Sequence, residues 1–186
     1  MIFGIPRELK DHETRVGAGL IPRNVATLIA QGHTVYFQKG VMEPAGVSDE
    51  EFLKVGAKCV DTMEEIYEKC DFIGKFKDMT DGDMKMPFKK GQIIMTAFHM
   101  AEGTAKPEQV KILADAGVTC ISIETSRYPD GSRAMTRPMG EIAGRTAPLL
   151  GGQYLQRLHR SRYRRKKSPR LHSRRRSCRY VRSSDC

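Results

Sequence analysis

The sequence predicts an α/β fold in which a mostly parallel β-sheet is flanked by helices. Up to about residue 125, short runs of β-branched and aromatic residues alternate with amphipathic segments, as in a chain of β-α-β units. Several of the apolar runs contain almost no polar residue, which is typical of strands that helices cover on both faces. The six expected strands span residues 2–5, 34–38, 58–60, 71–76, 92–98 and 118–124.

Four helices are predicted between these strands, because each intervening segment has signals for a helix beginning or end. The signals are a proline at the first helical position, a serine or threonine cap followed by a glutamate, or a terminating glycine. The residues concerned are Pro22 and Gly32, Ser48 and Glu51, Asp61 or Thr62, and Pro107 and Gly117.

Two other segments are predicted to form a surface loop and a longer helix. Residues 79–92, MTDGDMKMPFKKGQ, show scattered Gly, Asp and Pro without periodicity and are predicted to form a surface loop. A longer helix is predicted from Pro138 onward. Pro148 is expected to kink or end it, because proline removes a backbone donor and clashes with the preceding turn.

Charge is concentrated at the end of the chain. Residues 157–186 hold 13 of the 32 Lys and Arg residues and one of the 22 acidic residues, whereas residues 1–156 hold 19 basic and 21 acidic residues, a net charge of −2. The last segment is dense in like charge and poor in aliphatic residues, so it buries too little apolar surface to fold alone. We therefore expect one folded domain over residues 1–156 and a disordered Arg-rich tail over residues 157–186.

Cysteine spacing indicates a reducing compartment, and hydropathy indicates neither a signal peptide nor a membrane span. The cysteines form no CxxC pair and no ligand spacing with histidine, so no disulfide framework and no metal site are predicted; they are Cys59, Cys70, Cys120, Cys178 and Cys186. The first residues, MIFGIPRELK, look like a strand and not like a signal peptide, and no run approaches ~18 apolar residues. We expect a cytoplasmic protein without a membrane span.

Three charged or titratable residues beside predicted strands are candidates for binding or chemistry. Lys77 lies near the carboxyl end of the strand at 71–76, where open α/β sheets bind ligands, although Lys75 and Lys77 could both simply extend to water. His99 leaves the next strand, and its ordinary pKa near 6.5 suits proton transfer; a capping or loop histidine is the alternative. Arg15 follows the first strand and could clamp a carboxylate, or it could be a solvated loop residue.

Five motifs occur in order along residues 1–156. They are GIPRELKDHETRV, IGKFKD, GQIIMTAFH, VTCISIET and RPMGEIAGR. In their order and separations they resemble the N-terminal part of alanine dehydrogenases, a group that also includes the alpha subunit of the nicotinamide nucleotide transhydrogenase. The resemblance implies a Rossmann-like substrate domain.

The resemblance also implies roles for individual residues. Arg15 in ETRV and Lys77 in KFK match positions that hold the carboxylate and carbonyl end of pyruvate or L-alanine, and Lys75 is expected to be the exposed neighbour of Lys77. His99 matches the proton donor and acceptor of the family, and Met139 in RPMGE matches a residue that lines the substrate and nicotinamide pocket. The implied reaction is NAD-dependent oxidative deamination of L-alanine, in an enzyme that forms homo-oligomers.

The chain departs from the family where the cofactor would bind. The family uses a second domain with a GxGxxG fingerprint, and neither GAG at 17–19 nor GG at 151–152 has that spacing. We therefore expect a truncated fragment that is inactive alone and that exposes an apolar surface of low solubility. Gly140 stands where many members have a serine. Because glycine codons read out of frame become arginine codons, residues 157–186 are interpreted as a frameshift product.

Other functions stay open at this stage. The implied use of His99 favours alanine dehydrogenase over the transhydrogenase subunit, and we also prefer it to a carboxyalkyl amino-acid synthase of the same group. The alternative from a different class is nucleic-acid binding through the tail. Its cations and the aromatic residues Tyr163 and Tyr180 suit phosphate neutralisation and base stacking.

Overall fold

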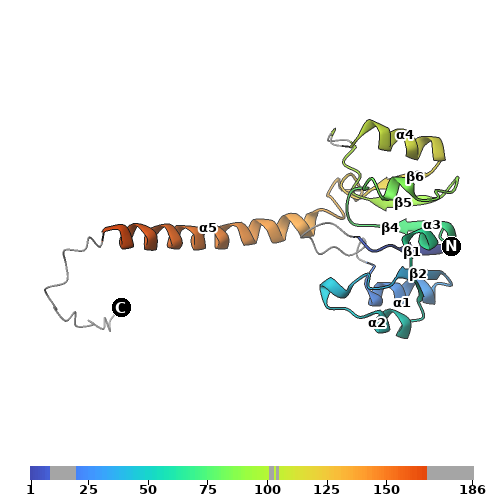
Figure 1. Ribbon diagram of the computed structural model, residues 1–186, viewed down its shortest axis with the longest axis horizontal. Helices are drawn as coiled ribbons and strands as arrows, with labels where there is room; N and C mark the ends of the chain where they lie inside the picture. Colours follow the sequence, from blue (N-terminus) through green and yellow to red (C-terminus); the bar gives the residue numbers. More distant parts are fainter. Residues whose placement is uncertain (9–19, 101–102, 104, 167–186) are drawn as a thin grey trace. The chain divides into compact units, whose positions relative to one another are not determined.

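The computed structural model describes residues 1–8, 20–100, 103 and 105–166, and the chain divides into two compact units, Met1–Arg137 and Pro138–Cys186. The first unit contains six strands: β1 Ile2–Ile5, β2 Thr34–Gln38, β3 Lys58–Val60, β4 Phe72–Gly74, β5 Ile93–Thr96 and β6 Thr119–Ser122. They form one sheet of order β3-β2-β1-β4-β5-β6 (Figure 1). Every neighbouring pair is parallel, which confirms the predicted α/β class.

Three of the six predicted strands, at 2–5, 34–38 and 58–60, agree with the structure residue for residue. The other three are shorter than predicted. In β4 the ladder to β5 has its last bond from the N–H of Lys75 to the carbonyl of Met95, at 2.9 Å. The next two amides then bond to a side chain from another segment. Apolar pattern alone does not reveal where such an exchange of partners ends a strand.

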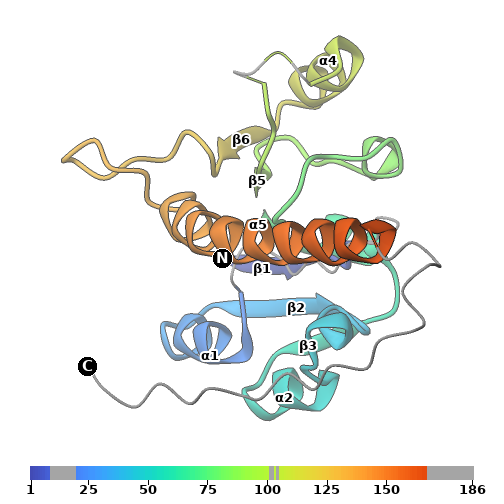
Figure 2. The ribbon, with the colours of Figure 1, turned by 90° about the vertical axis from the view of Figure 1, so that its left-hand side faces the viewer.

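The four predicted helices are α1 Pro22–Ala30, α2 Asp49–Lys54, α3 Met63–Lys69 and α4 Pro107–Ala116. Their end signals are confirmed. Pro22 and Pro107 occupy first-turn positions, Ser48 and Thr62 each form a capping box, and Gly117 ends α4 with a left-handed φ of 67°. Both views place α1 and α2 at the β2–β3 end of the sheet and α4 at the β5–β6 end (Figures 1 and 2).

Two apolar clusters cover the sheet, one on each face. Side chains of β1 and β2 alternate between them, because successive residues of a strand point to opposite faces. One cluster joins Ile5, Val35 and Phe37 to Val25 of α1 and Phe52 of α2. The other joins β3, β4 and β5 to α3 and α4; its buried members are Val60, Ile66, Tyr67, Cys70, Ile73, Met79, Ile94, Phe98 and Leu113.

β1 approaches α3 so closely that residue 4 has no room for a side chain. A Cβ built at Gly4 would lie 2.6 Å from Cγ2 of Ile66 and 2.8 Å from Sγ of Cys70. We expect Gly4→Ala to lower the free energy of unfolding by about 1–3 kcal/mol, the usual effect of overpacking a core, as measured by urea denaturation.

Gly82 provides the matched control for this substitution. It has a φ of −69°, and a Cβ there would meet only Oγ1 of Thr80 at 3.4 Å. Gly82→Ala is therefore expected to leave stability unchanged or to raise it by about 0.4–1 kcal/mol. Equal losses in the two variants would contradict the close approach of β1 and α3.

The predicted surface loop at 79–92 is partly wrong. It contains a short 3-10 helix, η3 at Asp83–Lys85, and it buries Met79 and Asp83. A second such helix, η2 at Glu43–Ala45, follows β2. The polar composition of 79–92 indicated a loop correctly for much of its length, but a buried aspartate needs tertiary partners that composition does not show.

The second unit contains α5, Arg137–Lys166. The sequence predicted that Pro148 would kink or end the helix; it lies inside α5, so the helix does not end there, and the kink stays a prediction. α5 continues through residues 157–166, at the beginning of the segment predicted as a tail, where Arg and Lys are good helix formers. Residues 167–186 lie outside the described residues, so the domain boundary at 156/157, the origin of the tail and its binding of nucleic acid stay predictions. No described helix is both long and apolar enough to cross a membrane.

Candidate functional site

The candidate site lies where the order of the strands reverses. Starting from β1, the chain adds β2 and β3 on one side of the sheet, and β4, β5 and β6 on the other. In open parallel sheets, ligands bind outside the carboxyl ends of the strands at such a point. The residues that follow β1, β4, β5 and β6 here include Glu8, Lys77, His99 and Glu124.

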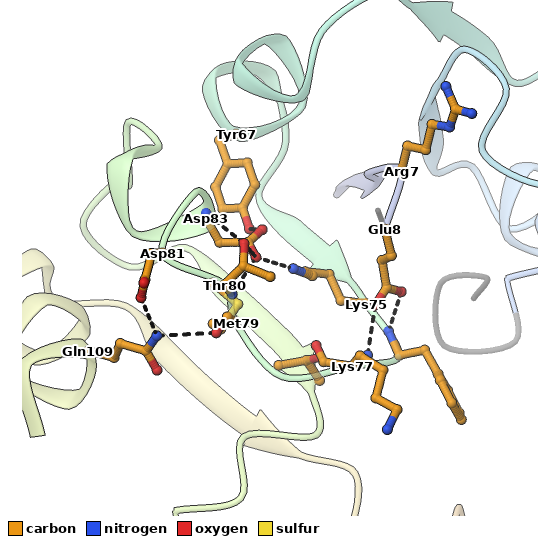
Figure 3. A network of polar contacts seen from close by, with 12 residues as sticks. Arg7, Glu8, Tyr67, Lys75, Lys77, Met79, Thr80, Asp81, Asp83 and Gln109 are labelled. Carbon is orange, nitrogen blue, oxygen red and sulfur yellow. Dashed lines mark hydrogen bonds and ion pairs between the residues drawn. The ribbon is translucent and has the colours of Figure 1, made fainter. Parts of the chain in front are cut away.

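Glu8 joins the segments that follow β1 and β4. Its Oε1 accepts a hydrogen bond from the backbone N–H of Phe76 at 2.6 Å, and its Oε2 accepts one from the N–H of Lys77 at 2.8 Å. Figure 3 shows the carboxylate facing this backbone, whereas the guanidinium of Arg7 points away from it. Burial raises the pKa of the Glu8 carboxyl above its ordinary value, although the two amides and the charge of Lys75 oppose the shift.

Lys75 is not the exposed neighbour that the sequence predicted. Its side chain is buried, and its Nζ lies 2.6 Å from Oδ2 of Asp83. Asp83 also accepts hydrogen bonds from the N–H and Oγ1 of Thr80, at 2.7 and 2.8 Å, and from the hydroxyl of Tyr67 at 3.4 Å (Figure 3). Burial, followed by the negative charge of Asp83, raises the pKa of Tyr67. The prediction failed because the partner of Lys75 comes from a segment read as a loop.

Lys77 directs its ammonium away from this buried pair (Figure 3). Its N–H bonds to Glu8, and its carbonyl accepts a hydrogen bond from Oγ1 of Thr96. Thr96 is completely buried at the carboxyl end of β5. The peptide groups of Lys77 are therefore held by one segment from each side of β4, while its side chain is partly exposed.

His99 follows β5, the strand beside β4. Its backbone N–H donates to Oε1 of Glu124 at 2.6 Å. Its φ is 55°, in the left-handed region that residues other than glycine seldom adopt. The pKa of Glu124 lies below its ordinary value. Burial acts to raise this pKa, but hydrogen bonds from Ser122 and from the backbone of His99 lower it by more. The histidine is thus held beside an ionised carboxylate at the end of β6.

The structure brings together two of the four predicted site residues. Lys77 and His99 both follow the carboxyl ends of adjacent parallel strands, so they lie at the same edge of the sheet. Arg15 lies outside the described residues. Met139 belongs to α5, in the second unit, and is 37% exposed. The roles of all four residues stay predictions.

Sequence reasoning missed Glu8, Asp83 and Glu124. Glu8 and Glu124 each follow a predicted strand, so the rule that singled out His99 applies to them as well. Asp83 gave no such signal, because it follows no strand and lies in a polar segment. In the part of the chain that the structure describes, no group of three His, Cys, Asp or Glu residues is arranged to hold a metal ion.

Comparison with known proteins now places the chain. Residues 4–143 match the model of the family described as alanine dehydrogenase/PNT, N-terminal domain. The chain belongs to this family. It is 36% identical over 157 residues to alanine dehydrogenase of Methanococcus maripaludis, covering 84% of this chain and 40% of that protein. It is 35% identical over 157 residues to alanine dehydrogenase of Mycobacterium tuberculosis strain CDC 1551, covering 84% and 41%.

Solved structures agree with this family membership. A structure named L-alanine dehydrogenase superposes with a TM-score of 0.76 at 31% identity, covering 85% of this chain and 42% of that one. A transhydrogenase from Sinorhizobium meliloti has a TM-score of 0.60 at 23% identity, over 70% of this chain and 37% of that one, and shares the fold. The chain spans about two fifths of the length of the curated alanine dehydrogenases that it matches.

The residues at the strand reversal do not fit the pyrophosphate of NAD. A dinucleotide site needs a glycine-rich turn whose free N–H groups face the phosphates. Here Pro6, Arg7 and Glu8 follow β1, and Glu8 already accepts the N–H groups of Phe76 and Lys77. A carboxylate in this place would repel a phosphate, so the described residues give no cradle for the cofactor that the alanine dehydrogenase family uses.

Proposed function

We propose that the chain is the substrate-binding domain of a cytoplasmic, homo-oligomeric alanine dehydrogenase, acting on L-alanine and pyruvate with NAD. The observation that carries the proposal is the family match combined with the position of Lys77 and His99 after adjacent strands. A cation and an imidazole, the side chain that most often transfers protons in enzymes, then share one edge of the sheet, and the oxidative deamination of an amino acid needs both. Because the described residues do not fit NAD, we derive no step through it.

Within the proposed site, Lys77 and Arg15 would both bind the substrate. Their cations would hold the carboxylate and carbonyl end of the substrate by charge-assisted hydrogen bonds, and this fixes the orientation of the reacting carbon. His99 would take a proton when water adds to the imine and give one when ammonia leaves. Met139 of α5 would exchange no protons in the reaction, since a thioether does not titrate.

Pyruvate binding by the full chain tests this function. We expect the wild-type chain to bind pyruvate in isothermal titration calorimetry, and Lys77→Met to weaken binding by about 10- to 100-fold, because a hydrogen bond to a charged group contributes roughly 1.5–3 kcal/mol. The control is Lys85→Met, the same loss of charge at an exposed residue of η3, which is expected to leave binding unchanged. Absence of binding to the wild-type chain, or equal binding by Lys77→Met, would contradict the proposal.

A further inference from the structure

The backbone of Lys77 lies beyond the end of β4, and side chains from other segments hold it there. The ladder between β4 and β5 ends with the N–H of Lys75, so the amides of Phe76 and Lys77 have no strand partner. Glu8 supplies one oxygen to each of them, at 2.6 and 2.8 Å, from a segment 68 and 69 residues away in sequence. Thr96 holds the carbonyl of Lys77 from the other side. Segments following β1 and β4 and the end of β5 therefore converge on one residue.

We propose that Glu8 is a positioning residue, whose ionised carboxylate fixes the Phe76–Lys77 backbone and thereby aims the Lys77 ammonium at the substrate carboxylate. The inference rests on the proposed function, because it takes Lys77 as the residue that binds pyruvate. Glu8 itself bonds to the two backbone amides, and the ammonium of Lys77 points away from the buried network (Figure 3). It would act through Lys77 and not on the substrate.

The surroundings of Glu8 indicate that this residue does more than stabilise the folded protein. The charged groups that act on it are Lys75, which favours its ionised form, and Asp83, which disfavours it. Since Lys75 and Asp83 form a buried pair, their effects partly cancel. Burial dominates and raises the pKa, so the protein keeps a carboxylate in a place where ionisation costs folding free energy. Such a cost is common where function selects the residue.

The sign of the pH dependence follows from the raised pKa. The folded state binds the Glu8 proton more tightly than the unfolded chain does, so the stabilisation from this group is complete below the ordinary pKa of 4.5. It is lost as the pH rises through the folded-state pKa. Pyruvate binding should change in the opposite direction, because the ionised carboxylate is the better acceptor for the two amides. A purely structural residue would shift stability and binding together.

The experiment compares the full wild-type chain with Glu8→Gln. Amide proton shifts of Phe76 and Lys77, followed by NMR from about pH 4 to about pH 8, are expected to titrate together in the wild-type chain and to lose this titration in Glu8→Gln. The variant should also bind pyruvate at least about tenfold more weakly, and its stability should lack the decline with pH. Glu51→Gln is the matched control, because Glu51 accepts the backbone N–H of Ser48 on the exposed end of α2. It should resemble the wild-type chain in all three measurements.

Each outcome decides between the two proposals. If the amide protons of Phe76 and Lys77 do not titrate in the wild-type chain, Glu8 does not hold them, and this inference is overturned without the need for a folded variant. If they titrate but Glu8→Gln binds pyruvate as the wild-type chain does, the positioning role is overturned. If the wild-type chain binds no pyruvate, the proposed function is contradicted, and Lys77 is then not positioned for a substrate carboxylate. Titration of the two amide protons would still show that Glu8 contacts the backbone.

Discussion

Asp83→Asn is expected to lower the free energy of unfolding by about 3–5 kcal/mol. The substitution removes the charge that pairs with Lys75 at 2.6 Å while both side chains are almost fully buried. Loss of one partner from a buried ion pair leaves the other charge without compensation, and this is far more costly than the pair itself is stabilising. Urea denaturation at neutral pH, followed by far-ultraviolet circular dichroism, measures the change.

Two further variants test whether the loss in Asp83→Asn comes from a buried charge left without a partner. Asp81→Asn removes a carboxylate from the exposed pair with Lys106, and we expect little change in stability because water screens that pair. The double variant Lys75→Met/Asp83→Asn should recover part of the loss, since no buried charge is then left unpaired. Equal stability of Asp83→Asn and Asp81→Asn would show that Lys75 finds water or another partner, against the buried pair described above.

Phe52→Ala is expected to cost about 3–5 kcal/mol, the range for removing a large aromatic side chain from a core. Phe52 of α2 is fully buried, and its ring stacks on that of Phe37 in β2 with centroids 4.9 Å apart. The short helix α2 has no other buried residue, so this side chain is its main attachment to the sheet. A calorimetric melting scan at fixed scan rate would show the loss as a lower Tm.

The neighbouring residue gives the control for α2. Leu53 is 51% exposed, so Leu53→Ala removes an apolar side chain of similar kind from the same helix without leaving a cavity. We expect its Tm to stay close to that of the wild-type chain. A loss in Leu53→Ala as large as that in Phe52→Ala would mean that the exposed side of α2 is covered in the folded protein.

Much of the fold follows from local sequence patterns. The capping boxes at Ser48 and Thr62 and the left-handed Gly117 lie where the residue types predict them, because a cap involves residues only a few positions apart. The strand at 34–38 agrees with the sequence for a similar reason, since its aromatic and β-branched run is bounded by polar residues. Parallel pairing follows from the alternation of strands and helices.

The candidate site was predictable to a lesser degree. Lys77 and His99 were found because each follows a strand, and the family resemblance strengthened that reading. Glu8 has the same local setting, yet its partners are 68 and 69 residues away, and no local pattern identifies which backbone amides lack a strand partner.

Residue types and short-range periodicity were enough to predict the α/β class, the beginnings and ends of the helices, and two ionisable side chains at the strand ends. Which of the two lysines is buried depends instead on contacts with distant parts of the chain. Lys75 and Lys77 share a face by strand alternation, but the strand ends at Gly74, and beyond it the direction of each side chain depends on distant groups. Asp83 draws Lys75 into the core, while Glu8 and Thr96 hold the backbone of Lys77 and leave its ammonium free to point away from the buried network.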